Sequence, residues 1–346
     1  MSKHTTTLIK GLAILMMLWL HLFNDAHVGA AAPLWFIGGV PVVSLIARAC
    51  NPVDLFIVLS GYGFRYTFYH GDVSVRLQFR RLLKLYICYW LTLIIFVGIG
   101  SFVNPANYPG SFSKVLLNVT SLDHTYNYET WFLLPYAVVS IFARRIFQLQ
   151  NKIGNLWSLA IWIVLYLASC FVISRNLVLQ VPVVGEVLST MIVCVKFVFP
   201  FEIGSCLYDI AARNNGLKLS WLNTWKAFAL LLLLLLSHTL FHSQAPNPLY
   251  AGGVVILMNN IRFPSFLSKT FTVLGKYSMP MWLTHTYFCI YLFHDFMYGF
   301  RYPLLIYVVL VVVSLMTAVA IMYLARAINN LAERRIFIQG KDKTWE

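Results

Sequence analysis

The chain has 346 residues, of which 60% are hydrophobic and 11% charged, and its mean hydropathy is +0.73. Soluble domains are about half apolar and a quarter charged, so this composition excludes a water-soluble globular protein. The net charge of +14 would suggest nucleic acid as the partner of a soluble protein. In a membrane protein an excess of cationic residues on one side explains it, and we expect no nucleic-acid partner.

Stretches long enough to cross a bilayer as helices recur along the chain, each span needing about 20 mainly apolar residues. The sequence predicts ten of them, at 8–27, 52–69, 82–102, 129–146, 156–174, 184–208, 222–241, 249–261, 271–294 and 303–328. No segment between them is long enough for a separate soluble domain. We therefore expect one all-α, polytopic, membrane-embedded domain over residues 1–346, with about the last 15 residues as a cytoplasmic tail.

The positions of the basic residues predict the orientation of these spans. With a cytoplasmic N-terminus, 21 of the 26 Lys and Arg residues lie in inner loops or at inner helix ends. Only Arg48, Lys114, Arg175 and Arg301 lie outside, and Lys196 lies within a span. Because inner loops are enriched in Lys and Arg, we expect a multi-pass protein of the cytoplasmic membrane with both termini in the cytoplasm.

The six cysteines are scattered, about one to a segment. The sequence contains no CxxC pair. We therefore expect neither disulfides nor a metal site.

The first span carries two side chains that are costly to place in a bilayer. Lys10 and His21 are eleven residues apart, which in a helix corresponds to about 16 Å and three turns, so both lie on one face. Lys10 at the inner mouth could bind phosphate, and His21 in the outer half could accept a proton. Alternatively, Lys10 extends to the membrane surface and His21 bonds a neighbouring helix.

The second span and the loop after it combine small and basic residues. Ser60, Gly61 and Gly63 form a patch that a ligand or, more commonly, another helix could approach closely. Basic residues follow at Arg65, Arg76, Arg80, Arg81 and Lys84. This cluster could reflect topology alone, hold anionic lipid headgroups, or bind the phosphates of a nucleotide-bearing donor.

Five short motifs follow one another along the chain. They are Lys10-x10-His21, FIVLSGYGFR at 56–65, RRLLKLY at 80–86, TWFL at 130–133 and YSMPMWLTH at 277–285. In their order and spacing the chain resembles the acyltransferase-3 family of integral membrane acyltransferases over nearly its whole length. The family carries Arg or Lys at the position of Lys10. Some members append an extracytoplasmic hydrolase-like domain, which we expect this chain to lack.

The resemblance implies transfer of an acyl group, usually acetyl and sometimes succinyl, from cytoplasmic acyl-CoA to a hydroxyl of a glycan or glycolipid. Such members modify exopolysaccharides and other sugars of the cell envelope. We expect acetyl-CoA as the donor, no metal, and an extracytoplasmic or lipid-linked glycan as the acceptor. A homo-oligomer stays an open alternative.

Acyl transfer to a hydroxyl needs a base, and His21 is the expected one, either by direct transfer or through an acyl-imidazole. The donor is expected to contact Lys10, Arg65, the basic residues Arg76, Arg80, Arg81 and Lys84, and the small residues Ser60 and Gly61.

Four further residues are candidates for contact with the donor or the acceptor. His285 lies near the middle of the ninth span, where an interhelical hydrogen bond is an equal alternative. Glu129 and Asp54 are acidic residues near the outer surface that could pair with His21 or bind sugar hydroxyls. Trp131 is also consistent with an interfacial anchor.

Two functions from other classes fit the same buried charges. A transporter or flippase of a lipid-linked sugar could use them as proton relays or substrate ligands. A non-catalytic subunit of a polysaccharide export system is the third alternative.

Overall fold

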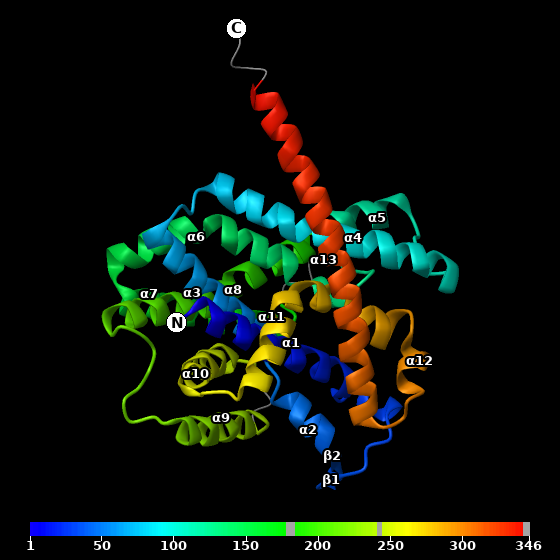
Figure 1. The fold of residues 1–346 in the computed structure, drawn as a ribbon, viewed down its shortest axis with the longest axis horizontal. Coiled ribbons are helices and arrows are strands. Elements are labelled where there is room, and N and C mark those ends of the chain that lie inside the picture. The colour runs from blue at the N-terminus through cyan, green and yellow to red at the C-terminus, as the bar shows by residue number, and fades with distance from the viewer. Residues whose placement is uncertain (178–183, 241–243, 342–346) are drawn as a thin grey trace.

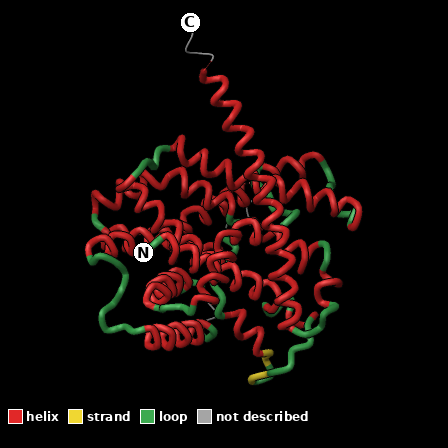
Figure 2. Tube along the Cα trace, viewed as in Figure 1, coloured by secondary structure: helices red, strands yellow, loops and turns green. Residues whose placement is uncertain are grey.

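The computed structural model describes residues 1–177, 184–240 and 244–341 (Figure 1). Within these ranges the chain is an all-α bundle, and β1 (Phe36–Ile37) and β2 (Val40–Pro41) form a short antiparallel hairpin at its edge (Figure 2). The polytopic all-α architecture predicted from hydropathy is therefore confirmed.

The helices vary widely in length. They are α1 (Lys3–Phe23), α2 (Val42–Arg48), α3 (Pro52–His70), α4 (Val75–Val103), α5 (Phe112–Val119), α6 (Leu133–Ile153), α7 (Asn155–Ser174), α8 (Val184–Arg213), α9 (Thr224–His238), α10 (Asn247–Asn260), α11 (Ser265–Thr286), α12 (His294–Tyr298) and α13 (Pro303–Lys341). Short 3-10 turns lie at η1 (Val28–Ala30) and η2 (Tyr128–Thr130), and a π-helical turn at η3 (Tyr287–Tyr291).

Each of the ten predicted spans coincides with a helix. In the described part of the chain, seven helical segments are long and apolar enough to cross a membrane. The other three predicted spans fall on α9, α10 and α11. The first two have 15 and 14 residues, and α11 is rich in Ser, Thr and Lys.

The helix boundaries differ from the predicted ones mainly at basic segments. Helix α4 begins at Val75, seven residues before the predicted span, so the basic residues expected in a loop lie on its first turns. Helix α13 continues to Lys341, into the predicted tail. Residue 241 of the seventh predicted span and residues 342–346 of the tail lie outside the described residues.

Helix α11 packs against α1, α4 and α13 in the bundle. Its backbone touches that of α1 because each helix has a glycine at the crossing. A Cβ atom on Gly11 would lie 2.0 Å from the carbonyl oxygen of Phe271, and one on Gly275 would lie 1.8 Å from that of Thr7. No larger residue fits at either position, so these glycines determine how short the distance between the α1 and α11 backbones can be.

A second close crossing joins α3 and α8. A Cβ atom on Gly61 would lie 1.9 Å from the carbonyl oxygen of Phe201, and one on Gly204 would lie 1.9 Å from that of Val58. Gly61 therefore meets a neighbouring helix, whereas Gly63 has no such neighbour and is exposed.

We expect Gly61→Ala to destabilise the protein by about 1–3 kcal/mol, because the added methyl group forces the α3 and α8 backbones apart. Gly63→Ala is the matched control in the same helix. It should be neutral or stabilising by about 0.5–1 kcal/mol, because alanine favours the helix. Thermal unfolding of the two purified variants in detergent measures the difference, and equal midpoints would contradict the proposed packing.

Candidate active site

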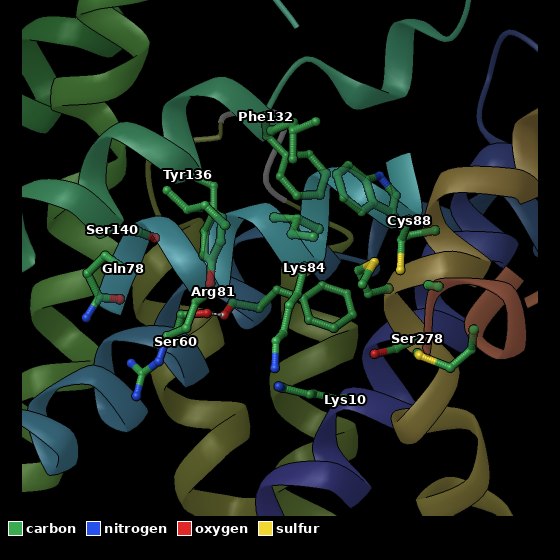
Figure 3. A pocket seen from close by; sticks show the side chains of 18 of the residues that line it. Lys10, Ser60, Gln78, Arg81, Lys84, Cys88, Phe132, Tyr136, Ser140 and Ser278 are labelled. Atoms are coloured by element: carbon green, nitrogen blue, oxygen red, sulfur yellow. Dashed lines mark hydrogen bonds between the residues drawn. The ribbon is translucent and has the colours of Figure 1, made fainter. Parts of the chain in front are cut away.

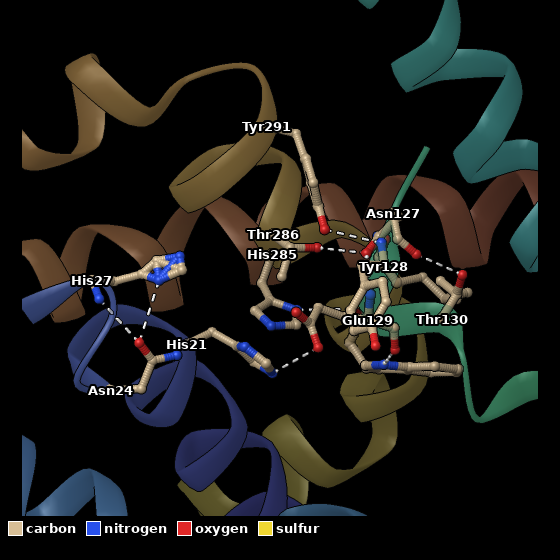
Figure 4. Close-up of polar contacts among 12 residues, drawn as sticks. His21, Asn24, His27, Asn127, Tyr128, Glu129, Thr130, His285, Thr286 and Tyr291 are labelled. Carbon is tan, nitrogen blue, oxygen red and sulfur yellow. Dashed lines mark hydrogen bonds and ion pairs between the residues drawn. The ribbon is translucent and has the colours of Figure 1, made fainter. Parts of the chain in front are cut away.

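Two imidazoles and a carboxylate meet in the interior (Figure 4). His21 lies near the end of α1 and is buried, and its Nε2 atom is 3.5 Å from Oε2 of the partly buried Glu129. The ring of His285, from α11, is centred 5.1 Å from the ring of His21. Residues from three distant parts of the sequence thus form one cluster, which we call the histidine cluster: His21, Glu129 and His285.

The hydrogen bond of His285 determines which of its ring nitrogens carries the proton. Its Nδ1 atom lies 2.8 Å from the carbonyl oxygen of Trp282, and a carbonyl can only accept, so Nδ1 is the donor. Nε2 is then left with a lone pair, and it is buried without a partner among the described residues. A neutral imidazole with a free acceptor nitrogen is suited to take a proton.

Glu129 is held in place by Asn127, a residue that the sequence did not single out (Figure 4). The Asn127 amide donates to the carbonyl oxygen of Leu283 at 3.1 Å, and its oxygen accepts from the Thr286 hydroxyl at 3.0 Å and from the Glu129 backbone N–H at 3.2 Å. The Trp282 indole also donates to the Glu129 carbonyl oxygen, at 3.1 Å. The η2 segment is therefore fastened to α11, and Glu129 with it.

A cavity of about 520 Å³ lies near the N-terminal half of α1 (Figure 3). Cationic side chains from three helices line it: Lys10 of α1, Arg81 and Lys84 of α4, and Arg326 of α13. Apolar and aromatic side chains complete the lining, among them Phe132 and Trp282. This basic cavity can therefore hold a ligand that has both an anionic and a less polar part.

Trp282 connects the basic cavity with the histidine cluster. Its ring stacks on that of Phe132 with centroids 4.1 Å apart, and both rings line the cavity. Its backbone carbonyl accepts from His285, and its indole donates to the Glu129 carbonyl. The same residue thus forms part of the cavity wall and bonds two members of the cluster.

Several of the residues expected to contact the donor lie elsewhere. The Arg65 guanidinium is buried and engaged by Asp209, with Nη2 2.8 Å from Oδ2 and Nε 3.0 Å from Oδ1, and by Asn151 at 2.7 Å. It does not line the basic cavity. Arg76 and Arg80 are exposed on α4 outside the cavity lining.

Of the remaining predicted site residues, some line the basic cavity and others contact residues outside it. Ser60 lines the basic cavity. Asp54 interacts with the Asn51 side chain and with the charge of Lys196, and it does not pair with His21. The Trp131 ring contacts the rings of Phe132 and Phe197.

Arg326 is a cavity residue that the sequence gave no reason to select. It lies at the end of the last span that the sequence predicts to face the cytoplasm, where a basic residue is expected from topology alone. The packing of α13 beside α4 is not visible in the local sequence. The sequence also did not indicate a partner for Lys196. In the structure the Lys196 Nζ atom donates to Oε1 of Gln244 at 3.1 Å. Within the described ranges, no group of three or more His, Cys, Asp or Glu side chains is arranged to hold a metal ion.

Long apolar helices enclosing a basic cavity beside buried imidazoles define a polytopic membrane protein with an internal site suited to proton transfer. A family model described as an acyltransferase domain matches residues 6–324, nearly the whole chain. The chain belongs to this family, the acyltransferase-3 family, as its motifs predicted, and it is a membrane acyltransferase. No curated protein and no solved structure matches it.

We expect Asn127→Ala to lower acyl transfer by about 10- to 100-fold, because three hydrogen bonds that position Glu129 are lost. The amount of protein inserted in the membrane should change little. Asn107→Ala is the matched control, since Asn107 is an exposed asparagine whose side-chain amide donates to the side chain of Asn104 in the same loop. Initial rates in membranes normalised for protein content measure the effect, and unchanged activity of Asn127→Ala would rule out its positioning role.

Proposed function

We propose that the protein transfers an acyl group, most favourably acetyl, from acyl-CoA to a hydroxyl of an extracytoplasmic or lipid-linked glycan. One observation carries the proposal: Trp282 lines the basic cavity and is hydrogen-bonded to two members of the histidine cluster, Glu129 and His285. A donor bound by its phosphates in the cavity would thus have its thioester directed toward a proton acceptor.

The cavity chemistry supports a CoA thioester as the donor. Four cations on α1, α4 and α13 can bind phosphate oxygens, two of them arginines whose guanidinium groups suit bidentate contacts. The volume of about 520 Å³ lies within the range of about 300–1,000 Å³ of small-molecule sites. Lys10 and His21 are about 16 Å apart along α1, a distance comparable to an extended pantetheine arm.

Arg65, Arg76 and Arg80 are not part of the proposed phosphate site. Arg65 already has a carboxylate partner in Asp209, and we assign it to holding α3 against α8. Arg76 and Arg80, which do not line the cavity, suit anionic lipid headgroups better than a ligand bound there.

The histidine cluster supplies the base. Glu129 favours the tautomer of His21 that keeps its proton on Nε2, which leaves Nδ1 to accept one. The acceptor hydroxyl gives its proton to this imidazole, its oxygen forms the new ester bond to the acyl carbon, and the carbon–sulfur bond of the thioester breaks. The sulfur then takes the proton from the imidazolium, which gives the free thiol of CoA.

The distribution of Lys and Arg supports an orientation with the cavity toward the cytoplasm and the histidine cluster toward the outer half of the membrane. Acyl-CoA is a cytoplasmic metabolite, whereas the proposed acceptors are assembled on the envelope side. The protein would therefore carry only the acyl group toward the outer side, while CoA stays in the cytoplasm.

We expect His21→Ala to reduce acylation of glycan by about 10²–10⁴-fold, the usual contribution of a general base. The measurement supplies radiolabelled acetyl-CoA to inverted membrane vesicles and follows label in glycan and in protein. His4→Ala, which changes an exposed histidine of the same helix, is the control and should keep full activity. Full acylation by His21→Ala would remove the proposed base, and transport of a sugar lipid without labelling would favour a flippase.

We expect Arg81→Gln to raise the KM for acetyl-CoA by about 10- to 100-fold with a smaller change in kcat, because a charge-assisted contact to phosphate is lost. The dependence of KM on ionic strength should also weaken. Arg175→Gln, at the exposed end of α7, is the control that removes a positive charge outside the cavity. Equal KM values for the two variants would contradict phosphate binding in the basic cavity.

A further inference from the structure

Two buried polar side chains of the basic cavity have no hydrogen-bond partner in the described part of the chain. Gln78, on the first turns of α4, is fully buried, and neither Nε2 nor Oε1 of its amide has a hydrogen-bond partner among the described residues. Ser140, in α6, is 1% exposed, and its hydroxyl likewise has none. Both side chains line the cavity, at the end away from Cys88 and Ser278 (Figure 3).

Gln150, the other fully buried glutamine among the described residues, is paired, whereas buried hydroxyls without a partner also occur outside the cavity, at Ser158 and Ser314. The buried amide of Gln150 donates to Asn155 at 3.1 Å and accepts from Ser205 at 2.6 Å. Ser60 lines the same cavity, but its hydroxyl donates to the carbonyl oxygen of Phe56 in its own helix, at 2.8 Å. A buried polar group without a partner lowers stability, so an unpaired pair facing one cavity needs a reason.

The chemistry of the two side chains defines what would satisfy them. A carboxamide presents a donor beside an acceptor, and a hydroxyl can act as either. Their complement is an uncharged group that also has an acceptor beside a donor. Arg81 lies one turn after Gln78 and lines the same cavity, so this neutral subsite adjoins the cationic one.

We propose that Gln78 and Ser140 form a neutral subsite that binds a donor–acceptor edge of the acyl donor. The inference rests on the proposed function, because it takes the ligand to be a CoA thioester. Adenine carries such an edge, which a carboxamide can bind through two hydrogen bonds. The amides of the pantetheine arm are the second candidate, since each offers an uncharged donor and an uncharged acceptor on opposite sides, either of which the subsite could bind. Lys10, Arg81, Lys84 and Arg326 would bind the phosphates next to this subsite.

The test begins with Gln78→Leu, which removes both hydrogen-bonding atoms at nearly constant volume. We expect the KM for acetyl-CoA to rise by about 10- to 100-fold, as for the loss of a buried hydrogen-bonded group. The thermal midpoint without donor should stay unchanged or rise, because an unsatisfied amide is replaced by an apolar group. Ser140→Ala should act in the same direction with a smaller rise in KM.

Gln150→Leu is the matched control, since it changes an equally buried glutamine that has protein partners and lies outside the basic cavity. It should lower the thermal midpoint and leave the KM of the folded protein unchanged. A raised KM with an unchanged or raised thermal midpoint identifies a ligand contact, whereas a lowered midpoint with an unchanged KM identifies a structural one. Each variant can be assigned separately, so the test still works if the other is poorly expressed.

Two modified donors identify the group that is bound. Acetyl-1,N6-etheno-CoA has a blocked adenine edge, and acetyl-4′-phosphopantetheine has no adenosine. If adenine is bound, Gln78→Leu raises KM for acetyl-CoA but not for either modified donor. If a pantetheine amide is bound, it raises KM for all three. Both outcomes support the subsite.

An unchanged KM of Gln78→Leu with all three donors would overturn the inference and leave the proposed function intact, because the unaltered protein would still transfer acetyl. Failure of the unaltered protein to transfer acetyl from any of them would instead overturn the proposed function, and the inference with it.

Discussion

The backbones of α1 and α11 touch where Gly11 and Gly275 remove the side chains that would separate them. This contact sets the distance between the two helices that carry His21 and His285. It also brings Lys10 and Ser278, one from each helix, to the wall of the same cavity. In lipid, little hydrophobic force drives helices together, so close packing at small residues has to hold them.

The polar residues of the site are supported mainly by one helix. Asn127 and Trp282 connect the η2 segment to α11 through side-chain and backbone groups, and the Tyr128 backbone N–H adds a bond to the Tyr291 hydroxyl at 2.9 Å. The end of α11 continues into a π-helical turn, an irregularity that is frequent at functional sites. The position of the Glu129 carboxylate is therefore determined by α11, although the α11 residues that hold this segment are more than 150 residues away in sequence.

Hydropathy predicted the positions of the helices well, because a helix in lipid must be apolar over a length set by the bilayer. Helical periodicity placed Lys10 and His21 on one face, and a single helix indeed carries both. The partners across the bundle could not be predicted in this way. Arg65 and Asp209 are 144 residues apart, and only the packing of α3 on α8 brings them together. The same holds for Arg326 and for the glutamine partner of Lys196.

Lys10 and His21 belong to one uninterrupted helix, so the separation between the proposed phosphate-binding end and the proposed proton acceptor is set by the rise of that helix. Discrimination between acyl donors would then depend on the length of the donor between its phosphate and its acyl carbonyl, as well as on its affinity. A small acyl phosphate could occupy the cationic end without its carbonyl arriving at the imidazole, and so could be bound but not used.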